Sequence, residues 1–596
     1  MATGKNSKNF IVYIDQDKIE PDLARETVIN FDPLNRAGKE GGFYLTEEGE
    51  LQIDDEDVME AHKMAINKYP YDNAIKMIQL PFEEGDKIHQ FGENSFRLYG
   101  LPSPDEGRVV GLIGKNGIGK SVSLKILSGD IKPNLGDWEN PPDWEEILKD
   151  YRGTELQNHF KALKNDDITS AYKPQQVEDL PKVFDGKIRE LLGKNAEDSE
   201  VEEVAEKLDI DHLLDRDIEH LSGGELQRAA IASTLLKDAD LYMFDEPSSF
   251  LDVKQRLKSG NEIRKTKEDS SVLAVEHDLA TLDLVSDNIH IFYGEAAAYG
   301  MVSDSLSAKE GINQYLDGYL PSQNVRFRSE SIKFDRTKRS QVENKPVVLE
   351  FPFFTKDFGE GEFSLETEGG ELHEEEILAI FGENGLGKTV FAKMLAGAVE
   401  PDEGDSPEIS ISYKPQYLKA QDRSVEMALR EYADIGSKRF ENRIAGPLEL
   451  ENLYENNLQE LSGGELQKVG IAICLSRDAE VYLLDEPSAY LDVEARVKLG
   501  KMLKRFARKN EKPLLVIDHD LLLLDYIADR GMVFKGEPGV KGKASKPVMI
   551  GDALNTFLEE VDLTFRKDPD TGRPRANKPG SQKDKEQRKS GDYYEQ

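Results

Sequence analysis

Two stretches of this chain fit the phosphate-binding pattern GxxxxGK[ST], and each follows a short apolar run. The first loop covers residues 114–121 after Val109–Ile113, and the second covers residues 382–389 after Ile377–Phe381. In such a loop the glycines let backbone N–H groups wrap phosphates, the lysine reaches the terminal phosphates and the hydroxyl ligates Mg²⁺. The two loops therefore predict an α/β fold with two nucleotide-binding units in tandem.

The motifs that follow the first loop are repeated, in the same order, after the second. Each loop precedes Tyr-Lys-Pro-Gln, Leu-Ser-Gly-Gly-Glu, Asp-Glu-Pro-Ser, Leu-Asp and a triplet of acidic residue, His and Asp. The first set occupies residues 172–175, 221–225, 245–248, 251–252 and 276–278, and the second occupies residues 413–416, 461–465, 485–488, 491–492 and 518–520. This is the motif order of the ATP-binding-cassette (ABC) ATPases, which the chain resembles over both halves.

The residue types at these positions suit hydrolysis of ATP. A strand-terminal Asp can hold Mg²⁺, the Glu after it can orient or deprotonate the attacking water, and Gln and His can contact the metal, the water and the γ-phosphate. The expected catalytic residues are Glu246, His277, Glu486 and His519. The expected Mg²⁺ ligands are Ser121, Gln175, Asp245, Thr389, Gln416 and Asp485. The expected ATP-binding residues of the loops and the Tyr-Lys-Pro-Gln motifs are Gly114, Asn116, Gly117, Gly119, Lys120, Ser121, Gln175, Gly382, Asn384, Gly385, Gly387, Lys388, Thr389 and Gln416.

The Leu-Ser-Gly-Gly-Glu signature is expected to serve the opposite cassette, as the resemblance implies. A serine hydroxyl and backbone N–H groups at a helix start form an anion site. Ser462 and Gly464 should close over the ATP held by Lys120. In the same way, Ser222 and Gly224 should close over the ATP held by Lys388. Closure would then depend on both bound nucleotides.

Length and composition fit a multidomain protein that does not cross a membrane. The 596 residues include one cysteine, Cys474, whose apolar neighbours indicate a core position. No run of about 18 uncharged apolar residues occurs. Residues 1–10 lack an apolar signal core, so a reducing cytoplasm is the expected location.

The strong acidity of the chain argues against a nucleic-acid partner unless basic residues cluster locally. The net charge of −38 comes from 115 acidic and 77 basic residues. Residues 326–339 nevertheless hold six basic residues against two acidic ones, and residues 565–596 hold nine against six. An acidic surface suited to high salt, with an ordinary linker and tail, would also explain these numbers.

The sequence around these basic clusters narrows the resemblance to one family. Gly-Tyr-Leu-Pro at 318–321 precedes Asn-Val-Arg-Phe-Arg at 324–328, and Arg-Pro-Arg stands at 573–575. These strings are very similar to the two hinges of the ABC class E ATPases, the ribosome-recycling factors also called RNase L inhibitor proteins. The resemblance implies a monomer that meets the small ribosomal subunit and a release or rescue factor. It also implies ribosomal RNA contacts by Arg326, Arg328, Arg573 and Arg575.

The first cassette carries an insertion that the second lacks. Lys120 and Gln175 are 55 positions apart, whereas Lys388 and Gln416 are 28 apart. Apolar residues between positions 144 and 160 fit two short amphipathic helices broken at Gly153. The stretch at about 137–165 resembles the helix-loop-helix that class E proteins place against the small subunit, although an inert surface elaboration would look the same.

The first 80 residues depart from the family pattern. Class E proteins begin with a ferredoxin-like domain that holds two [4Fe–4S] clusters on eight cysteines, in runs such as C-x₂-C-x₂-C-x₃-C-P. Counting back from Pro70 places Tyr69, Ala65, His62 and Met59 where thiolates should stand, and Asp32 replaces another. No iron–sulfur cluster is expected, and His62 is interpreted as an ordinary polar residue. Side-chain packing could keep the ferredoxin-like shape, with a candidate core of Ile11, Val12, Ile14, Phe43, Leu45, Ile53 and Met64.

The predicted architecture is α/β, with two tandem ABC domains behind a small α+β head. The head covers residues 1–80, the first cassette 81–315, a hinge 316–345, the second cassette 346–560 and a basic tail 561–596. The leading interpretation is an ATP-driven clamp that splits ribosomes, with ATP and Mg²⁺ as its cofactors. An ABC class F-like translation factor, or another twin-cassette ATPase with a different client, remains the alternative.

Adenine is expected to stack on an aromatic residue about 20 positions before each phosphate loop. Phe91 and Phe96 qualify in the first cassette, and Phe351 or Phe358 in the second. Phe91 ranks first because it matches the stacking aromatic of the family. Core packing is the equally plausible alternative for each of the four.

Overall fold

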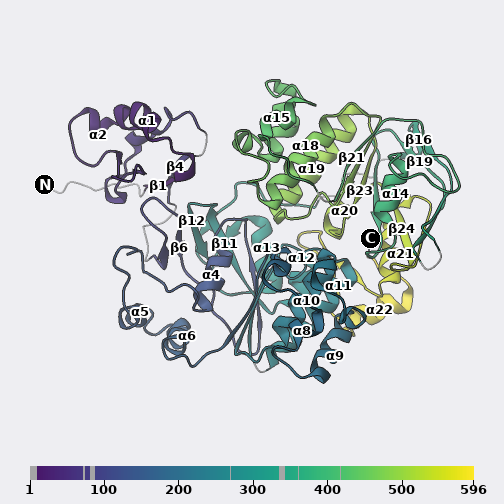
Figure 1. Ribbon diagram of the computed structural model, residues 1–596, viewed down its shortest axis with the longest axis horizontal. Helices are drawn as coiled ribbons and strands as arrows, with labels where there is room; N and C mark the ends of the chain where they lie inside the picture. Colours follow the sequence, from purple (N-terminus) through teal and green to yellow (C-terminus); the bar gives the residue numbers. More distant parts are fainter. Residues whose placement is uncertain are drawn as a thin grey trace.

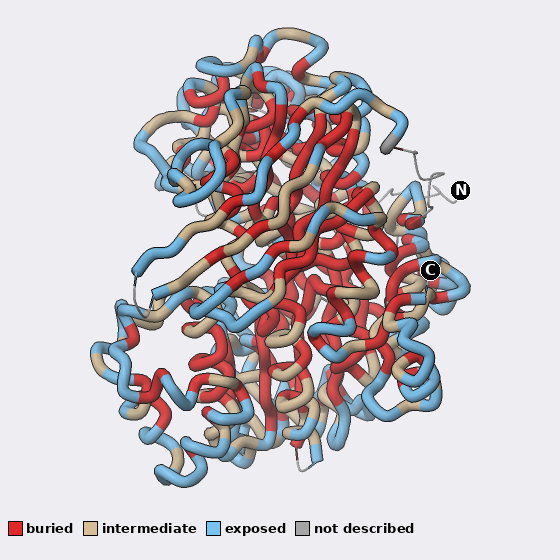
Figure 2. Tube along the Cα trace, turned by 90° about the vertical axis from the view of Figure 1, so that its right-hand side faces the viewer, coloured by how far each residue is buried: buried red, intermediate tan, exposed pale blue. Residues whose placement is uncertain are grey.

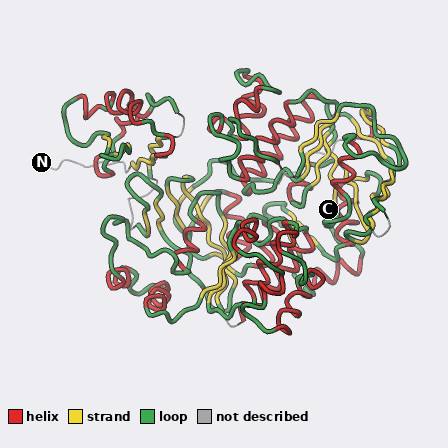
Figure 3. Tube along the Cα trace, viewed as in Figure 1, coloured by secondary structure: helices red, strands yellow, loops and turns green. Residues whose placement is uncertain are grey.

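The computed structural model describes residues 10–71, 74–80, 87–268, 270–334, 342–359, 362–416 and 418–595. Two large α/β units lie side by side, with a small head beside the first of them (Figure 1). In each unit the strands gather in the middle and helices surround them (Figure 3). The head and the twin cassettes agree with the fold class predicted from the sequence.

The sheet of the first cassette has nine strands, in the order β5-β6-β12-β11-β7-β10-β9-β8, with β13 beside β11. Parallel pairing joins β11, β7, β10, β9 and β8, and every residue of β7 and β9 is buried. Its strands are β5 (His89–Gln90), β6 (Arg97–Tyr99), β7 (Val109–Ile113), β8 (Ser170–Lys173), β9 (Leu241–Asp245), β10 (Ser271–Val275), β11 (Asn288–Glu295), β12 (Tyr299–Val302) and β13 (Leu306–Ser307). Its helices are α4 (Lys120–Leu127), α5 (Trp144–Asp150), α6 (Glu155–Lys164), α7 (Leu180–Val183), α8 (Ile188–Leu192), α9 (Asp198–Lys207), α10 (Gly223–Leu235), α11 (Val253–Lys265), α12 (Leu279–Val285) and α13 (Ala308–Asp317).

The second cassette repeats this topology, in the order β17-β18-β25-β24-β20-β23-β22-β21 with β26 beside β24. A separate antiparallel pair joins β16 (Val347–Phe351) to β19 (Gly370–His373). The sheet strands are β17 (Phe354–Asp357), β18 (Ser364–Thr367), β20 (Ile377–Phe381), β21 (Ile411–Lys414), β22 (Val481–Asp485), β23 (Leu514–Ile517), β24 (Arg530–Glu537), β25 (Lys541–Ala544) and β26 (Val548–Met549). The helices are α14 (Lys388–Leu395), α15 (Val425–Arg430), α16 (Lys438–Phe440), α17 (Gly446–Leu448), α18 (Gly463–Ser476), α19 (Val493–Asn510), α20 (Leu521–Ile527) and α21 (Ile550–Glu560).

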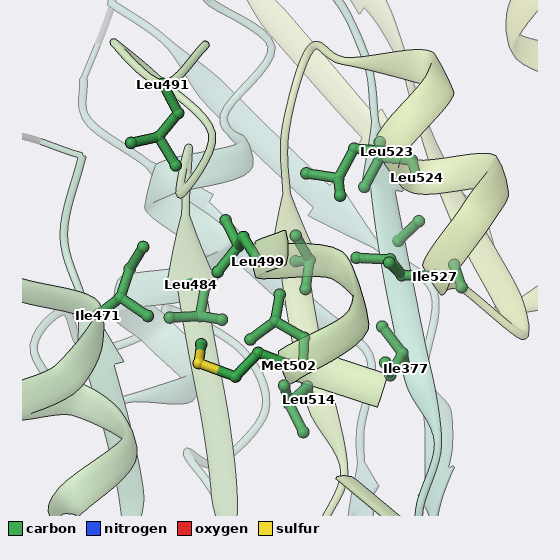
Figure 4. Close-up of a cluster of buried hydrophobic side chains, with 14 of the residues drawn as sticks. Ile377, Ile471, Leu484, Leu491, Leu499, Met502, Leu514, Leu523, Leu524 and Ile527 are labelled. Atoms are coloured by element: carbon green, nitrogen blue, oxygen red, sulfur yellow. The ribbon is translucent and has the colours of Figure 1, made fainter. Parts of the chain in front are cut away.

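Apolar side chains between sheet and helices hold each cassette together. Buried segments run through the strands of both units, while the outer faces are exposed (Figure 2). Leu484 of β22 and Leu499 of α19 meet in the second core, beside Leu524 of α20 (Figure 4). Cys474 is buried in this cluster, which confirms it as a core residue, and burial raises the pKa of its thiol to about 11. Among the described residues, no helix has both the length and the apolarity needed to cross a membrane.

The head combines short helices with two small antiparallel sheets. Strand β1 (Phe10–Ile14) pairs with β4 (Ile75–Gln79), and β2 (Tyr44–Leu45) pairs with β3 (Leu51–Gln52). The short helices are α1 (Pro21–Ala24), α2 (Pro33–Arg36) and α3 (Lys63–Ile66). Most of the candidate core is buried, but the prediction for Met64 is wrong because its side chain is 71% exposed. Asn94 of the first cassette exchanges two hydrogen bonds with Ile53, which fixes the head to that cassette.

The insertion packs on the first cassette, and the tail packs on both cassettes. Helices α5 and α6 stand in the stretch where the sequence pattern predicts two helices, and Gly153 between them adopts a φ of 84°. Their apolar residues join the first core. The tail forms β27 (Phe565–Lys567), β28 (Pro574–Ala576) and α22 (Gln582–Ser590), and β28 contacts α12. A hairpin of β14 (Tyr319–Leu320) and β15 (Val325–Arg326) lies between the cassettes in the sequence.

Candidate ATP sites

Each phosphate loop lies between a fully buried strand and a helix that starts with the loop lysine. At the first site Lys120 donates hydrogen bonds to the carbonyls of Gly114 and Lys115, at 2.9 and 2.7 Å. Lys388 makes the same contacts at the second site, to Gly382 and Glu383, both at 2.8 Å. Each ammonium thus sits inside its own loop, where phosphate oxygens would be its acceptors.

A hydroxyl and a carboxylate face each other beside each loop. Ser121 Oγ donates to Asp245 Oδ2 at 2.7 Å, and Thr389 Oγ1 donates to Asp485 Oδ2 at 2.9 Å. Burial raises the pKa of Asp245, and it raises the pKa of Asp485 to about 6. A divalent cation would favour the charged form of both carboxylates, so hydroxyl and carboxylate together fit Mg²⁺.

Each candidate catalytic glutamate lies between a glutamine and a histidine. Gln175 Nε2 donates to Glu246 Oε1 at 2.7 Å, and His277 Nε2 lies 3.3 Å from the same oxygen. The second site repeats this arrangement. There, Gln416 donates to Glu486 at 2.8 Å, and His519 Nε2 lies at 3.4 Å. The structure therefore brings together the glutamine, glutamate and histidine that the sequence singled out in each cassette.

Charge around the glutamates keeps them ionised. Burial alone would raise the pKa of Glu246, but His277 and the nearby lysines lower it to about 2. The pKa of Glu486 is also lowered to about 2, against the effect of burial, by His519, Gln416 and Lys388. An ionised carboxylate can accept a hydrogen bond from a water and so orient it for attack.

The chain is strained where it leaves each glutamate. Glu246 has a φ of 49° and Glu486 a φ of 46°, and the aromatic residues Phe250 and Tyr490 have φ values of 64° and 62°. Left-handed backbone is unfavourable for these residue types and persists only where surrounding contacts enforce it. The strain occurs at the same two positions in each cassette, next to the candidate chemistry.

The loops that follow the glutamates reach the opposite cassette. In the first site the Asn116 backbone N–H donates to Asp492 Oδ2 at 3.2 Å, and its side chain donates to the Tyr490 carbonyl at 3.3 Å. In the second site Asn384 donates to Asp252 at 2.9 Å and to the Phe250 carbonyl at 3.3 Å. The rings of Phe250 and Tyr490 meet edge to face, with centroids 5.6 Å apart. We call residues 248–252 and 488–492 the D-loops.

The signature motifs begin helices, as an anion site requires. Ser222 caps α10 and Ser462 caps α18, each in a capping box with the glutamate three residues on. A Cβ on Gly464 would lie 2.9 Å from the Tyr490 carbonyl, and one on Gly224 would lie 3.1 Å from the Phe250 carbonyl. The second signature therefore packs on the D-loop that contacts the first phosphate loop, and the reverse holds for the first signature.

Sequence reasoning missed several residues behind each site. Lys173 is fully buried and donates to the Asp245 carbonyl at 2.9 Å, and Lys414 does the same to Asp485 at 2.8 Å. The Ser248 hydroxyl donates to Glu276 at 2.6 Å, linking the D-loop to the residue before His277. These residue types recur at the same positions of both repeated motif sets, and this repetition could have indicated a role for them beside the ATP sites.

The candidate adenine aromatics separate into exposed and packed residues. Phe91 is 52% exposed and Phe358 44%, whereas Phe351 is buried and packs on Phe391. The ring of Phe96 would meet a Cβ placed on Gly119, so Phe96 covers the phosphate loop. Exposure favours Phe91 and Phe358 as stacking surfaces, and the alternative of Phe351 is excluded by its burial in the core.

The four arginines expected to contact RNA differ in their exposure. Arg573 is fully buried, so it cannot contact RNA in this conformation. Arg575 pairs with Asp283 of α12 through two hydrogen bonds, at 2.6 and 2.8 Å, and Arg328 pairs with Glu494 of α19. Arg326 is exposed over the Tyr319 ring. Arg336, Lys338 and Arg339 lie outside the described residues.

The head offers no thiolate at the positions where the family holds its clusters. Ala65 and Tyr69 lie in the head core, while Asp32 accepts hydrogen bonds from the backbones of Leu34 and Asn35 at 2.8 and 3.2 Å. His62 is a fully buried polar residue, with Nε2 3.6 Å from Asp32 Oδ2. These residues do not fit a [4Fe–4S] cluster, which cysteine thiolates hold.

Comparison with known proteins agrees with this geometry. The family model described as ABC transporter matches residues 103–249 and 366–489. An uncharacterized ABC transporter ATP-binding protein of Methanocaldococcus jannaschii is 45% identical, with 98% of this chain and 97% of the relative covered. Translation initiation factor RLI1 of Saccharomyces cerevisiae is 41% identical, with 99% and 98% covered.

Two solved structures are also similar. A structure described as ribosome-bound archaeal Pelota and ABCE1 contains a chain that is 45% identical, with a TM-score of 0.93, covering 98% of this chain and 99% of that one. A complex of archaeal ribosomal stalk protein aP1 and archaeal ribosome recycling factor aABCE1 contains one that is 48% identical, with a TM-score of 0.80 and 86% and 99% covered. The protein is thus an ATPase of the ABC superfamily with two cassettes. Within that superfamily the chain belongs to the class E family, that of RLI1, ABCE1 and the RNase L inhibitor.

Proposed function

We propose that this ATPase is a clamp that splits ribosomes into subunits and binds the small subunit in the cytoplasm. The observation that carries the proposal is the contact of each D-loop with the opposite phosphate loop, through Asn116 and Asn384. This contact couples the distance between the cassettes to the two nucleotide sites. The related chains were solved with a ribosomal stalk protein and in a ribosome-bound state with Pelota.

The residues support the following cycle. Lys120, with Ser462 and Gly464 from the other cassette, holds the first ATP, and Lys388, with Ser222 and Gly224, holds the second. The hydroxyl–aspartate pairs and the two glutamines would hold Mg²⁺, which would supply positive charge against the phosphates. Glu246 and Glu486 orient the attacking waters, and His277 and His519 contact the γ-phosphates. Loss of the γ-phosphates removes the bridge between the cassettes, and the clamp opens.

The head is proposed to act without an iron–sulfur cluster. Its core is made by side-chain packing and by the buried Asp32 and His62. A rigid head fixed to the first cassette can still transmit closure to a release or rescue factor by contact. Purified protein should lack absorbance near 400 nm, and iron chelation should leave its ATPase activity unchanged.

Exposed basic residues are proposed to meet ribosomal RNA. Arg326 of the hinge, with Lys578 and Lys589 of the tail, is exposed and belongs to the two basic clusters. Contacts with RNA phosphates release counterions, so binding should weaken steeply as salt rises. Reversing these three charges should weaken subunit binding without changing affinity for ATP.

Sedimentation with purified small subunits tests the proposed function. The protein should co-sediment with a non-hydrolysable ATP analogue and dissociate with ADP. The variant Glu246→Gln/Glu486→Gln should co-sediment with ATP itself. If the wild type bound no subunit with either nucleotide, the clamp would have a different client.

A further inference from the structure

Two ion pairs of opposite polarity link the cassettes, one at each ATP site. At the first site Lys115 of the phosphate loop lies 3.3 Å from Glu494, two residues after the D-loop aspartate. At the second site Glu383 of the phosphate loop lies 3.0 Å from Lys254, again two residues after that aspartate. The motif positions are equivalent, yet the signs of the charges are exchanged.

Both pairs accompany the backbone contacts that define closure. The residue after Lys115 donates its N–H to Asp492, and the residue after Glu383 donates its N–H to Asp252. Glu494 and Glu383 are mostly buried, with 14% and 17% of their side chains exposed, so the contact partly removes them from water. These ion pairs therefore require the two cassettes to face each other.

We propose that these exchanged charges are a specificity element that lets the first cassette close only on the second. If two first cassettes faced each other, Lys115 would meet Lys254. If two second cassettes faced each other, Glu383 would meet Glu494. Like charges in such a contact are unfavourable, so the pattern favours the intramolecular pairing and opposes the pairing of identical cassettes on separate chains.

At the first site, Arg328 of the hinge joins the Lys115–Glu494 ion pair and extends it into a network. Glu494 also receives Arg328 at 3.2 Å and Lys498 at 3.3 Å, and Arg328 is only 10% exposed. Arg328 in turn donates to the carbonyls of Tyr315 and Leu316 at the end of α13. Burial would raise the pKa of Glu494, but Lys115, Arg328 and Lys498 lower it below its ordinary value. Closure at the first site is thereby coupled to the hinge.

The test uses the free chain, so it does not depend on ribosome binding. Fluorophores on Val183→Cys and Met427→Cys, exposed positions in the first and second cassettes, would report closure by energy transfer. Native Cys474 stays unlabelled because it is buried. A non-hydrolysable ATP analogue is titrated, and the concentration for half-maximal closure is measured.

Lys254→Glu places a carboxylate against Glu383, which reproduces the like-charge contact of a wrong pairing. The half-closing concentration should rise by about fivefold. Adding Glu383→Lys should return it to within about twofold of the wild type, because the swapped pair is again attractive. Lys258→Glu, one turn further along α11, reverses a charge whose partner Asp209 is in the same cassette, and closure should be unchanged.

Rescue by the second substitution separates the proposal from other effects. Glu383→Lys alone could disturb its own phosphate loop, but Lys254→Glu could not repair that. Restored closure in the double variant supports the proposal. It is overturned if Lys254→Glu closes like the wild type, or if the double variant closes no better than the two single changes combined. Loss of ribosome binding in any of these variants would bear on the clamp function alone.

Discussion

The two cassettes share one skeleton but differ in the charges placed on it. Both cassettes share the strand order, the lysine contacts of the phosphate loop, the positive φ values around the D-loop and the glutamate between a glutamine and a histidine. The cassettes differ at two pairs of equivalent positions. The phosphate loop has Lys115 in the first cassette and Glu383 in the second, and the residue before the histidine is Glu276 in the first and Asp518 in the second. The backbone conformation and the motif residues therefore determine the catalytic geometry in both cassettes. The side chains next to them differ in charge or length and so distinguish the two halves.

The tail adds a second asymmetry, because it follows the second cassette and packs on Asn555 of its α21, yet it also reaches α12 of the first cassette. Arg575 binds Asp283 of α12, the helix that begins just after His277. The equivalent position of α20 is Asp525. A segment that follows the second cassette in sequence thus contacts the helix just after His277 of the first, which ties the two halves together.

The largest expected effect tests whether both halves share one chemistry. Glu246→Gln and Glu486→Gln should each slow hydrolysis at their own site by on the order of 10³-fold, because the carboxylate that orients water is lost. Single-turnover hydrolysis, with the other site inactivated, measures each rate. A large decrease for one glutamate only would show that the shared geometry does not mean shared catalysis.

Breaking the contact between Asp283 and the tail arginines should loosen the tail. Asp283→Ala removes the partner of a buried arginine, which typically costs about 4 kcal/mol. Amide exchange in β27 and β28 should lose about 10³-fold of its protection, an effect of the same size. Asp525→Ala is the matched control. Equal loss of protection in both variants would mean that the tail does not discriminate between the cassettes.

The pH dependence of stability compares Glu276 of the first cassette with Asp518, the equivalent residue of the second. Burial raises the pKa of Glu276 to about 7, although Ser248 donates to it. The folded state therefore binds the proton more tightly than the unfolded state. The resulting stabilisation is complete below about pH 4.5 and is lost as pH rises to about 7, by about 3 kcal/mol.

Glu276→Gln should abolish this dependence, since an amide does not titrate. Both tryptophans lie in the first cassette, so their fluorescence in urea reports its unfolding separately. Asp518→Asn supplies the comparison in the second cassette. If the free-energy difference between wild type and Glu276→Gln stayed constant from pH 4.5 to 7, the buried carboxyl would not be protonated there.

The repeated motifs were sufficient to predict the twin α/β fold and the grouping of Gln175, Glu246 and His277. They succeed because backbone geometry and residue type together define phosphate chemistry. Charge clusters were less informative, because a count of arginines cannot distinguish an exposed side chain from Arg573, which turns inward to Asp283. The Lys115–Glu494 pair was also missed, since its partners are far apart in sequence and meet only when the cassettes face each other.

The smallest expected effect concerns adenine. Phe91 and Phe358 occupy matching places before β6 and β18, and both are exposed. Stacking on an aromatic ring contributes about 1 kcal/mol or more per base, so Phe91→Ala should raise the KM for ATP at the first site about fivefold, with kcat nearly unchanged. The measurement uses a Glu486→Gln background, and Phe358→Ala in a Glu246→Gln background tests the second site. Phe351→Ala is the contrasting control, because removing a buried ring should lower stability instead of nucleotide affinity. An unchanged KM in Phe91→Ala would leave adenine recognition in the first cassette to other residues, and would break the correspondence between the two sites at that point.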